Sequence, residues 1–136
     1  MNFETVLSYA ELPDLNNSHY PYSLDDYRID HDEVKRVLVW LRSKRVEEIV
    51  KVKVADRLHS PHTDSVVARC VQDFKVRKLN WRKVDLCLAG LDPNWTLRTL
   101  HLYSSGNEAV IRSWFSELKD EKGELDKGSL VWMEKV

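Results

Sequence analysis

The feature that most constrains the fold is a spacing of apolar residues that occurs three times. Each copy fits the frame L-x-x-L-x-L, and the copies occupy Ile49 to Val54, Val76 to Trp81 and Leu97 to Leu102. The end of each copy alternates apolar and polar residues, as in Val52-Lys53-Val54, which is the period of a strand with one buried face. We therefore expect three short strands, 49–54, 76–81 and 97–102, that bury their frame residues on one side.

Segments with helical spacing lie between the frames. The first begins after Asp32, a residue type favoured at the N-cap, and its apolar residues recur at i, i+3, i+4 and i+7: Val34, Val37, Leu38 and Leu41. Further helices are expected at 63–74, near 84–91 and at 107–119, and a last strand is expected at Leu130 to Met133. Strands and helices therefore alternate along the chain.

The frames start at residues 49, 76 and 97, so the steps between them are 27 and 21 residues. Strand–helix units at such steps predict an α/β fold, a short leucine-rich-repeat-like solenoid of about four parallel strands alternating with helices. A compact doubly wound α/β sheet has the same element content and remains the alternative. The recurring frame and the short crossovers favour the solenoid.

Charge is distributed unevenly along the chain. Residues 1–33 carry a net charge of -7, residues 34–83 a net charge of +9 and residues 84–136 a net charge of -3, although the whole chain has a net charge of -1. Four of the five tyrosines lie before residue 28. We expect residues 1–32 to form an acidic, Tyr-rich extended arm and residues 33–136 to form a single α/β repeat-like domain.

Length and composition limit the class of protein. A chain of 136 residues matches one ordinary domain, and no apolar run approaches the roughly 20 residues that a membrane span needs. The N-terminal sequence has no basic start followed by an apolar run, so it does not match a secretory signal. Two cysteines do not make a disulfide framework, so we expect an intracellular, cytoplasmic protein.

Three phrases carry a resemblance to a known kind of protein region: LHSPHTDSVVARC (58–70), KLNWRKVDLC (78–87) and LRTLHLYSSGNEAVIRSW (97–114). With them, residues 34–136 resemble a leucine-rich-repeat-like region of fungal multidomain proteins that also carry a subtilisin-like serine protease domain. The resemblance covers about three quarters of the chain and implies a degenerate leucine-rich repeat with an interaction role. Neither a G-T-S nor an H-G-T-H phrase is present, so the resemblance implies no protease activity here.

The loop after the first frame holds a candidate metal cluster: Asp56, His59, His62 and Asp64. Loops at the carboxyl ends of parallel strands bind ligands in α/β proteins, but His-x-x-His across Pro61 is not a usual zinc spacing. The favoured interpretation is structural. Pro61 sets a turn, Thr63 or Asp64 caps the next helix, and the histidines are polar turn residues, so no metal is expected.

Other reactive residue types have structural interpretations as well. Cys70 lies on the apolar stripe of its helix with Val66 and Val67, and Cys87 lies between Leu86 and Leu88, so we expect both to be small buried hydrophobes. The SSGN stretch at 104–107 precedes a helix and could receive an anion, but Asn107 as a helix cap explains it better. We therefore expect no catalytic residue and no cofactor.

The polar residues between the frame residues suggest a binding surface. They form an outward ladder across neighbouring strands: Lys51, Lys53, Lys78, Asn80, Thr99 and His101. The sequence predicts a non-enzymatic protein–protein recognition module that binds an acidic protein partner there and is masked by the acidic arm. A nucleic-acid-binding domain that uses the basic stretch 34–83, with Trp81 nearby for stacking, is the alternative.

Overall fold

The structure is a computed structural model of the whole chain, and it describes residues 5–15, 33–91, 96–118 and 130–136. The described residues form, in chain order, β1 (Val6–Glu11), α1 (Glu33–Ser43), β2 (Glu48–Val54), α2 (Asp64–Phe74), β3 (Lys78–Val84), β4 (Thr99–Ser104), α3 (Glu108–Leu118) and β5 (Leu130–Lys135). None of the helices in these ranges is long and apolar enough to cross a bilayer.

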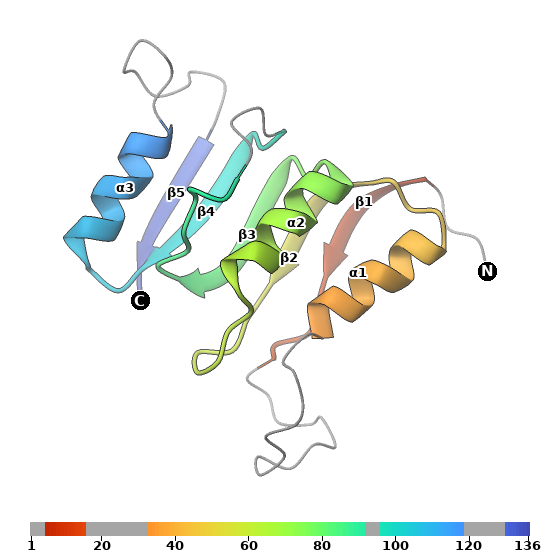
Figure 1. Cartoon of the computed structure of the whole chain (residues 1–136), viewed down its shortest axis with the longest axis horizontal. Coiled ribbons are helices and arrows are strands. Elements are labelled where there is room, and N and C mark those ends of the chain that lie inside the picture. Colours follow the sequence, from red (N-terminus) through yellow and green to blue (C-terminus); the bar gives the residue numbers. More distant parts are fainter. Residues whose placement is uncertain (1–4, 16–32, 92–95, 119–129) are drawn as a thin grey trace.

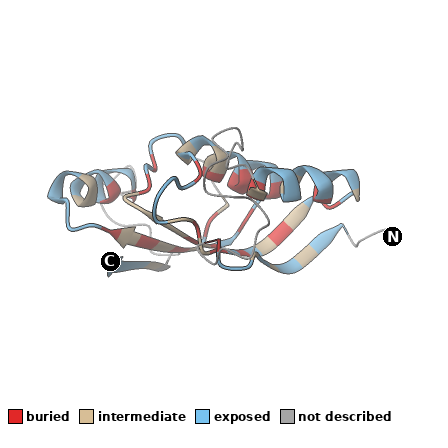
Figure 2. Ribbon diagram, turned by 90° about the horizontal axis from the view of Figure 1, so that it is seen from below, coloured by how far each residue is buried: buried red, intermediate tan, exposed pale blue. Residues whose placement is uncertain are grey.

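The five strands are parallel and lie side by side in chain order, β1-β2-β3-β4-β5 (Figure 1). The three helices lie on one side of the sheet (Figure 2). A doubly wound sheet needs helices on both faces and a reversal of strand order, so that alternative is wrong. The predicted α/β fold of parallel strands alternating with helices is confirmed, with five strands where about four were expected. We call the side away from the helices the open face.

The repeated frame forms the core. All nine frame residues of β2, β3 and β4 and the turns before them are at most 3% exposed: Ile49, Val52, Val54, Val76, Leu79, Trp81, Leu97, Leu100 and Leu102. They pack in one cluster with apolar residues of the helices, such as Val67, Phe74 and Trp114. Since each copy is too short to bury its own apolar surface, the stack of neighbouring strands stabilises all of them together.

Strand β1 corrects the expected domain boundary. Residues 6–11, expected within an arm that precedes the domain, pair with β2, and the register sets Leu7 beside Ile49 and Ala10 beside Val52. Leu7, Ala10 and Leu12 therefore make a fourth copy of the frame, partly buried against the core. The extended conformation was expected, but its place in the sheet was not. Residues 16–32 of the predicted arm lie outside the described residues.

The helix expected near 84–91 is absent. Strand β3 continues to Val84, and Asp85 then takes a positive φ of 57°. Leu86 and Leu88 are buried while Cys87 between them is exposed, so this segment has the period of an extended chain. The indole N–H of Trp114 donates to the carbonyl of Leu86 at 2.6 Å and ties the segment to α3. Residues 85–91, which follow β3 in the chain, thus pack on the sheet as coil and not as a helix.

Candidate functional site

The strand register brings the six predicted binding residues together in two rows across the open face. The first row is Lys51, Lys78 and Thr99, and the second is Lys53, Asn80 and His101. Neighbouring residues in a row lie on adjacent strands, about 4.8 Å apart. The frame residues on either side of them point into the core, so these side chains point outward.

The three lysines of the rows are exposed, whereas Asn80, Thr99 and His101 are half-buried. The ammonium of Lys51 lies 5.3 Å from the ring centroid of Tyr9 on β1. Lys53 lies 3.8 Å from the carboxylate of Glu11, with both side chains nearly half exposed. Exposed pairs of this kind contribute little stability, so these lysine side chains can bind a partner without a large loss of folding free energy.

An aromatic cluster lies at the β4–β5 end of the same face. The rings of His101 and Trp132 stack with centroids 6.0 Å apart and planes 13° apart, and Trp132 is 59% exposed. The hydroxyl of Tyr103 donates to Asn80 Oδ1 at 2.6 Å. The sequence interpretation missed Trp132 and Tyr103. The signal for Tyr103 was present, because it follows the buried frame residue Leu102, whereas Trp132 lies outside the frames, between half-buried Val131 and exposed Met133.

The protonation of His101 follows from this location. Burial lowers the pKa of His101 below its ordinary value, and the positive charges of Lys51 and Lys53 lower it further, while the Glu134 carboxylate opposes them. Because the ordinary pKa of histidine is about 6.5, His101 is mainly neutral at pH 7. Its ring therefore contributes an uncharged stacking surface beside the lysines.

A hollow of about 380 Å³ lies at the carboxyl ends of the strands on this face. Its polar lining comes from four strands: Lys53, Asn80, Arg82, Tyr103, Glu134 and Lys135. Arg82 Nε is buried and has no hydrogen-bond partner, and the guanidinium lies only loosely, at 3.9 Å, from Asp14. Buried donors in native proteins are normally satisfied, so Arg82 stands out among the side chains of the open face.

Asp56 and His62 form a buried pair on the helical side. Asp56 is fully buried and His62 is 2% exposed. The carboxylate accepts from His62 Nδ1 at 2.9 Å, from the His62 backbone N–H at 2.9 Å and from the Trp81 indole at 2.8 Å. His62 Nε2 accepts from the backbone N–H of Val34 at 3.3 Å. Both ring nitrogens are thus engaged, and the Asp56–His62 pair connects the loop after β2 with α1, through Val34, and with β3, through Trp81.

The four residues of the candidate metal cluster do not converge. His59 is exposed, while Asp64 pairs with Lys83 at 3.1 Å and accepts from the backbone N–H of Cys87. No group of three potential ligands occurs in the ranges that the structure describes. The turn interpretation of His62 is supported, although neither Thr63 nor Asp64 caps α2 through its side chain.

The two cysteines differ. Cys70 is fully buried on α2, and burial together with the Asp73 charge raises the pKa of its thiol to about 12. Cys87 is exposed, which contradicts the expectation that both are buried. The reason is the extended chain at 84–91, where burial alternates residue by residue.

Asn107 caps α3 as expected, since its Oδ1 accepts from the N–H of Ala109 at 3.0 Å. Trp81 is 1% exposed and hydrogen-bonded to Asp56, so its ring offers no stacking surface to a ligand. The frame position of Trp81 had indicated this burial.

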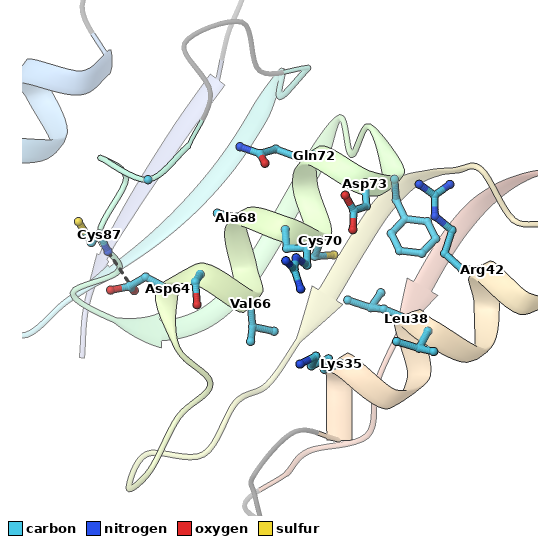
Figure 3. Close-up of a pocket in the computed structure, with 15 residues that line it drawn as sticks. Lys35, Leu38, Arg42, Asp64, Val66, Ala68, Cys70, Gln72, Asp73 and Cys87 are labelled. Atoms are coloured by element: carbon cyan, nitrogen blue, oxygen red, sulfur yellow. Dashed lines mark hydrogen bonds between the residues drawn. The ribbon is translucent and has the colours of Figure 1, made fainter.

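A larger hollow, of about 870 Å³, lies on the helical layer along α1 and α2 (Figure 3). Its lining mixes apolar and charged side chains, including Leu38, Val66 and Phe74. The guanidinium of Arg42 lies 5.3 Å from the Phe74 ring. None of the six predicted binding residues lines it, so the open face and this groove are separate surfaces.

Comparison of the chain with models of known protein families, with curated proteins and with solved structures finds no match. The candidate site must therefore be interpreted from its own geometry, and the resemblance to the fungal region stays a prediction.

Proposed function

We propose that this chain is a non-enzymatic recognition module, a leucine-rich-repeat-like region of a larger protein, that binds an acidic protein partner on its open face. The observation that carries the proposal is the placement of Lys51, Lys53 and Lys78. They lie on adjacent strands in neighbouring rows, exposed and held by weak pairs at most. A partner carboxylate that replaces these weak pairs gains charge-assisted hydrogen bonds at little cost to the fold.

The charge of the rest of the face favours a protein over a nucleic acid. Glu11 and Glu134 flank the lysines on β1 and β5, and they would repel a phosphate backbone. A protein surface can supply its own cations opposite these carboxylates. The alternative is favoured by one observation, the exposed Trp132 ring stacked on neutral His101, since aromatic platforms beside lysines bind single-stranded nucleic acids.

The experiment compares charge-reversal variants. Lys51→Glu with Lys53→Glu changes the open face, and Lys35→Glu with Arg69→Glu makes the same change of charge on exposed residues of the helices. Each tagged chain is used to capture proteins from a cell extract, which are identified by mass spectrometry. We expect the wild type and the Lys35→Glu with Arg69→Glu variant to capture acidic proteins that the Lys51→Glu with Lys53→Glu variant (the sheet variant) does not capture. All three chains should unfold at nearly the same temperature.

Two outcomes contradict the proposal. Equal capture by the sheet variant would remove the lysines from the interface. Tight binding of a single-stranded oligonucleotide, lost in the sheet variant and falling steeply with salt, would favour the nucleic-acid alternative.

Masking by the acidic arm is part of the same proposal. Residues 16–32 lie outside the described residues, and the argument rests on their charge beside the basic stretch. Because β1 belongs to the sheet, the arm is tested by replacing Asp25, Asp26 and Asp30 with Asn rather than by deletion. Affinity for the captured partner should rise at low salt and return to the wild-type value at high salt.

A further inference from the structure

The hollow on the open face and the aromatic cluster beside it form one compound site. The hollow is lined by Lys53 on β2, Arg82 on β3 and Tyr103 on β4. At about 380 Å³ it is at the small end of ligand pockets. It is large enough to receive one side chain of a partner.

Arg82 gives the hollow its preference for a carboxylate. Its Nε is buried without a hydrogen-bond partner, and its only described ion-pair partner, Asp14, is 3.9 Å away. The Arg82 side chain is 38% exposed, so the accessible terminal nitrogens of the guanidinium can bind both oxygens of a carboxylate at once. Lys53, itself 3.8 Å from Glu11, adds a second positive charge on the same lining.

Glu134 lines the hollow as well, and it limits the charge that the hollow accepts. Its charged lining side chains are three cations, Lys53, Arg82 and Lys135, and this one carboxylate, so the hollow keeps a net positive charge and attracts an anionic side chain. The chemistry therefore favours an Asp or Glu side chain of the partner.

The aromatic platform lies at a fixed distance from this hollow. Trp132 is two residues before Glu134 on β5, and His101 is two residues before Tyr103 on β4. Two residues along a strand span about 6.6 Å, and side chains two apart lie on the same face of an extended chain. A partner segment that runs along the strands can therefore place an acidic side chain in the hollow and its i+2 neighbour, or its i-2 neighbour, on Trp132.

We infer that Arg82, Lys53 and Trp132 bind an extended partner segment in which an acidic residue and a large apolar residue are separated by one residue. This inference rests on the proposed function and specifies the partner's sequence. Arg82 binds the carboxylate, and the exposed face of Trp132 packs against the apolar side chain.

The probes are five amidated peptides with identical Gly-Ser flanks. The central residues of four are Glu-Ser-Phe, Gln-Ser-Phe, Glu-Ser-Gly and Glu-Phe-Ser, and the fifth, Phe-Ser-Glu, tests the direction of the bound chain. Binding to the full chain is followed by NMR, because weak affinities are measurable and the Trp132 indole and Arg82 Nε–H signals report the location.

The expected result is a ranking. Either Glu-Ser-Phe or Phe-Ser-Glu should bind about tenfold more tightly than Gln-Ser-Phe, Glu-Ser-Gly and Glu-Phe-Ser. Tenfold is the loss expected when one charge-assisted pair or one aromatic contact is removed. Arg82→Gln should weaken the best Glu peptide about tenfold and leave the Gln peptide unchanged. Trp132→Ala should weaken the Phe peptides and leave Glu-Ser-Gly unchanged. Arg69→Gln and Phe115→Ala are matched controls on the helical layer.

Three results overturn the inference: no binding of any peptide, equal binding of the Glu and Gln peptides, or equal binding of Glu-Ser-Phe and Glu-Phe-Ser. If these occur while Lys51→Glu with Lys53→Glu still abolishes capture of acidic proteins, the proposed function stands without this site. If peptide binding follows the ranking but capture does not depend on the lysines, the proposed function fails and the site remains a peptide-binding site.

Discussion

Replacement of Asp56 by Asn tests whether the buried Asp56–His62 pair holds the helical layer on the sheet. Asp56 Oδ1 accepts from the Arg57 N–H and from His62 Nδ1, and Oδ2 accepts from the His62 N–H and from the Trp81 indole. An Asn side chain has nearly the same shape but replaces one oxygen by NH₂. Whichever oxygen is replaced, two donors lose their acceptor.

The magnitude follows from that count. Each buried donor left without a partner costs about 1–3 kcal/mol, and the remaining bonds weaken when the charge is lost. We expect Asp56→Asn to lower the free energy of unfolding by about 2–5 kcal/mol, a large part of the 5–15 kcal/mol of an ordinary domain. Asp73→Asn, on an exposed position of α2, should change it by less than about 0.5 kcal/mol.

The pH dependence gives this prediction a second readout. Burial alone would raise the pKa of Asp56, but the hydrogen bonds donated by His62 and Trp81 outweigh it and hold the pKa below its ordinary value. A carboxyl group with a lowered pKa in the folded state stabilises the fold above its unfolded pKa, about 3.9, and loses that contribution as the pH falls through the folded value. The difference between wild type and Asp56→Asn should therefore be largest at neutral pH and shrink below about pH 4.

Urea unfolding followed by circular dichroism measures both quantities. A loss below about 1 kcal/mol at pH 7 would refute the hydrogen-bond argument. A difference that stays constant down to pH 2 would show that the lost charge does not contribute to stability.

The other predictions concern single side chains. With Ellman's reagent the folded protein should react rapidly at one thiol, Cys87, and a second thiol, Cys70, should react only on unfolding, because burial raises its pKa to about 12. Urea unfolding should show a cost of about 1 kcal/mol for Asn107→Ala, which removes the cap of α3, and almost none for Asn107→Asp. Leu102 and Met133 share one register position but are 1% and 40% exposed, so Leu102→Ala should cost about 2–5 kcal/mol and Met133→Ala clearly less. Equal costs would contradict the lower burial of β5, the last strand of the sheet.

The sequence predicted the strands of the central sheet because burial at alternate residues is a local pattern. The frames at Ile49, Val76 and Leu97 also predicted which lysines point outward. The same frame in β1 was missed because small Ala10 occupies its middle position, among tyrosines and acidic residues that suggested an arm. The prediction of a helix near residue 84 was wrong because the spacing of its leucines fits both a helix and an extended chain. The positive φ of Asp85 belongs to the extended alternative that the structure adopts.

The sites were harder to predict because they depend on contacts between distant segments. His62 accepts from Val34, 28 residues earlier in the chain, and no local pattern indicates that contact. The exposure of Trp132 depends on β5 being the last strand of the sheet, and the hollow depends on four strands ending together. In contrast, the clustering of the lysines required only the correct strand register.

The residues that stabilise the fold and the residues proposed to bind a partner lie on opposite faces of the sheet. Parallel sheets are usually covered on both faces, but here the three helices of the described residues lie on one side (Figure 2). The buried frame residues and the Asp56 pair are on the covered side, so substitutions there change the free energy of unfolding. Lys51, Lys78 and Trp132 are on the open face, with side chains that are exposed, so substitutions there should change binding while the unfolding free energy stays within about 0.5 kcal/mol. A large loss of stability from these open-face substitutions would mean that the face is structural, and the argument for a recognition surface would then lose its basis.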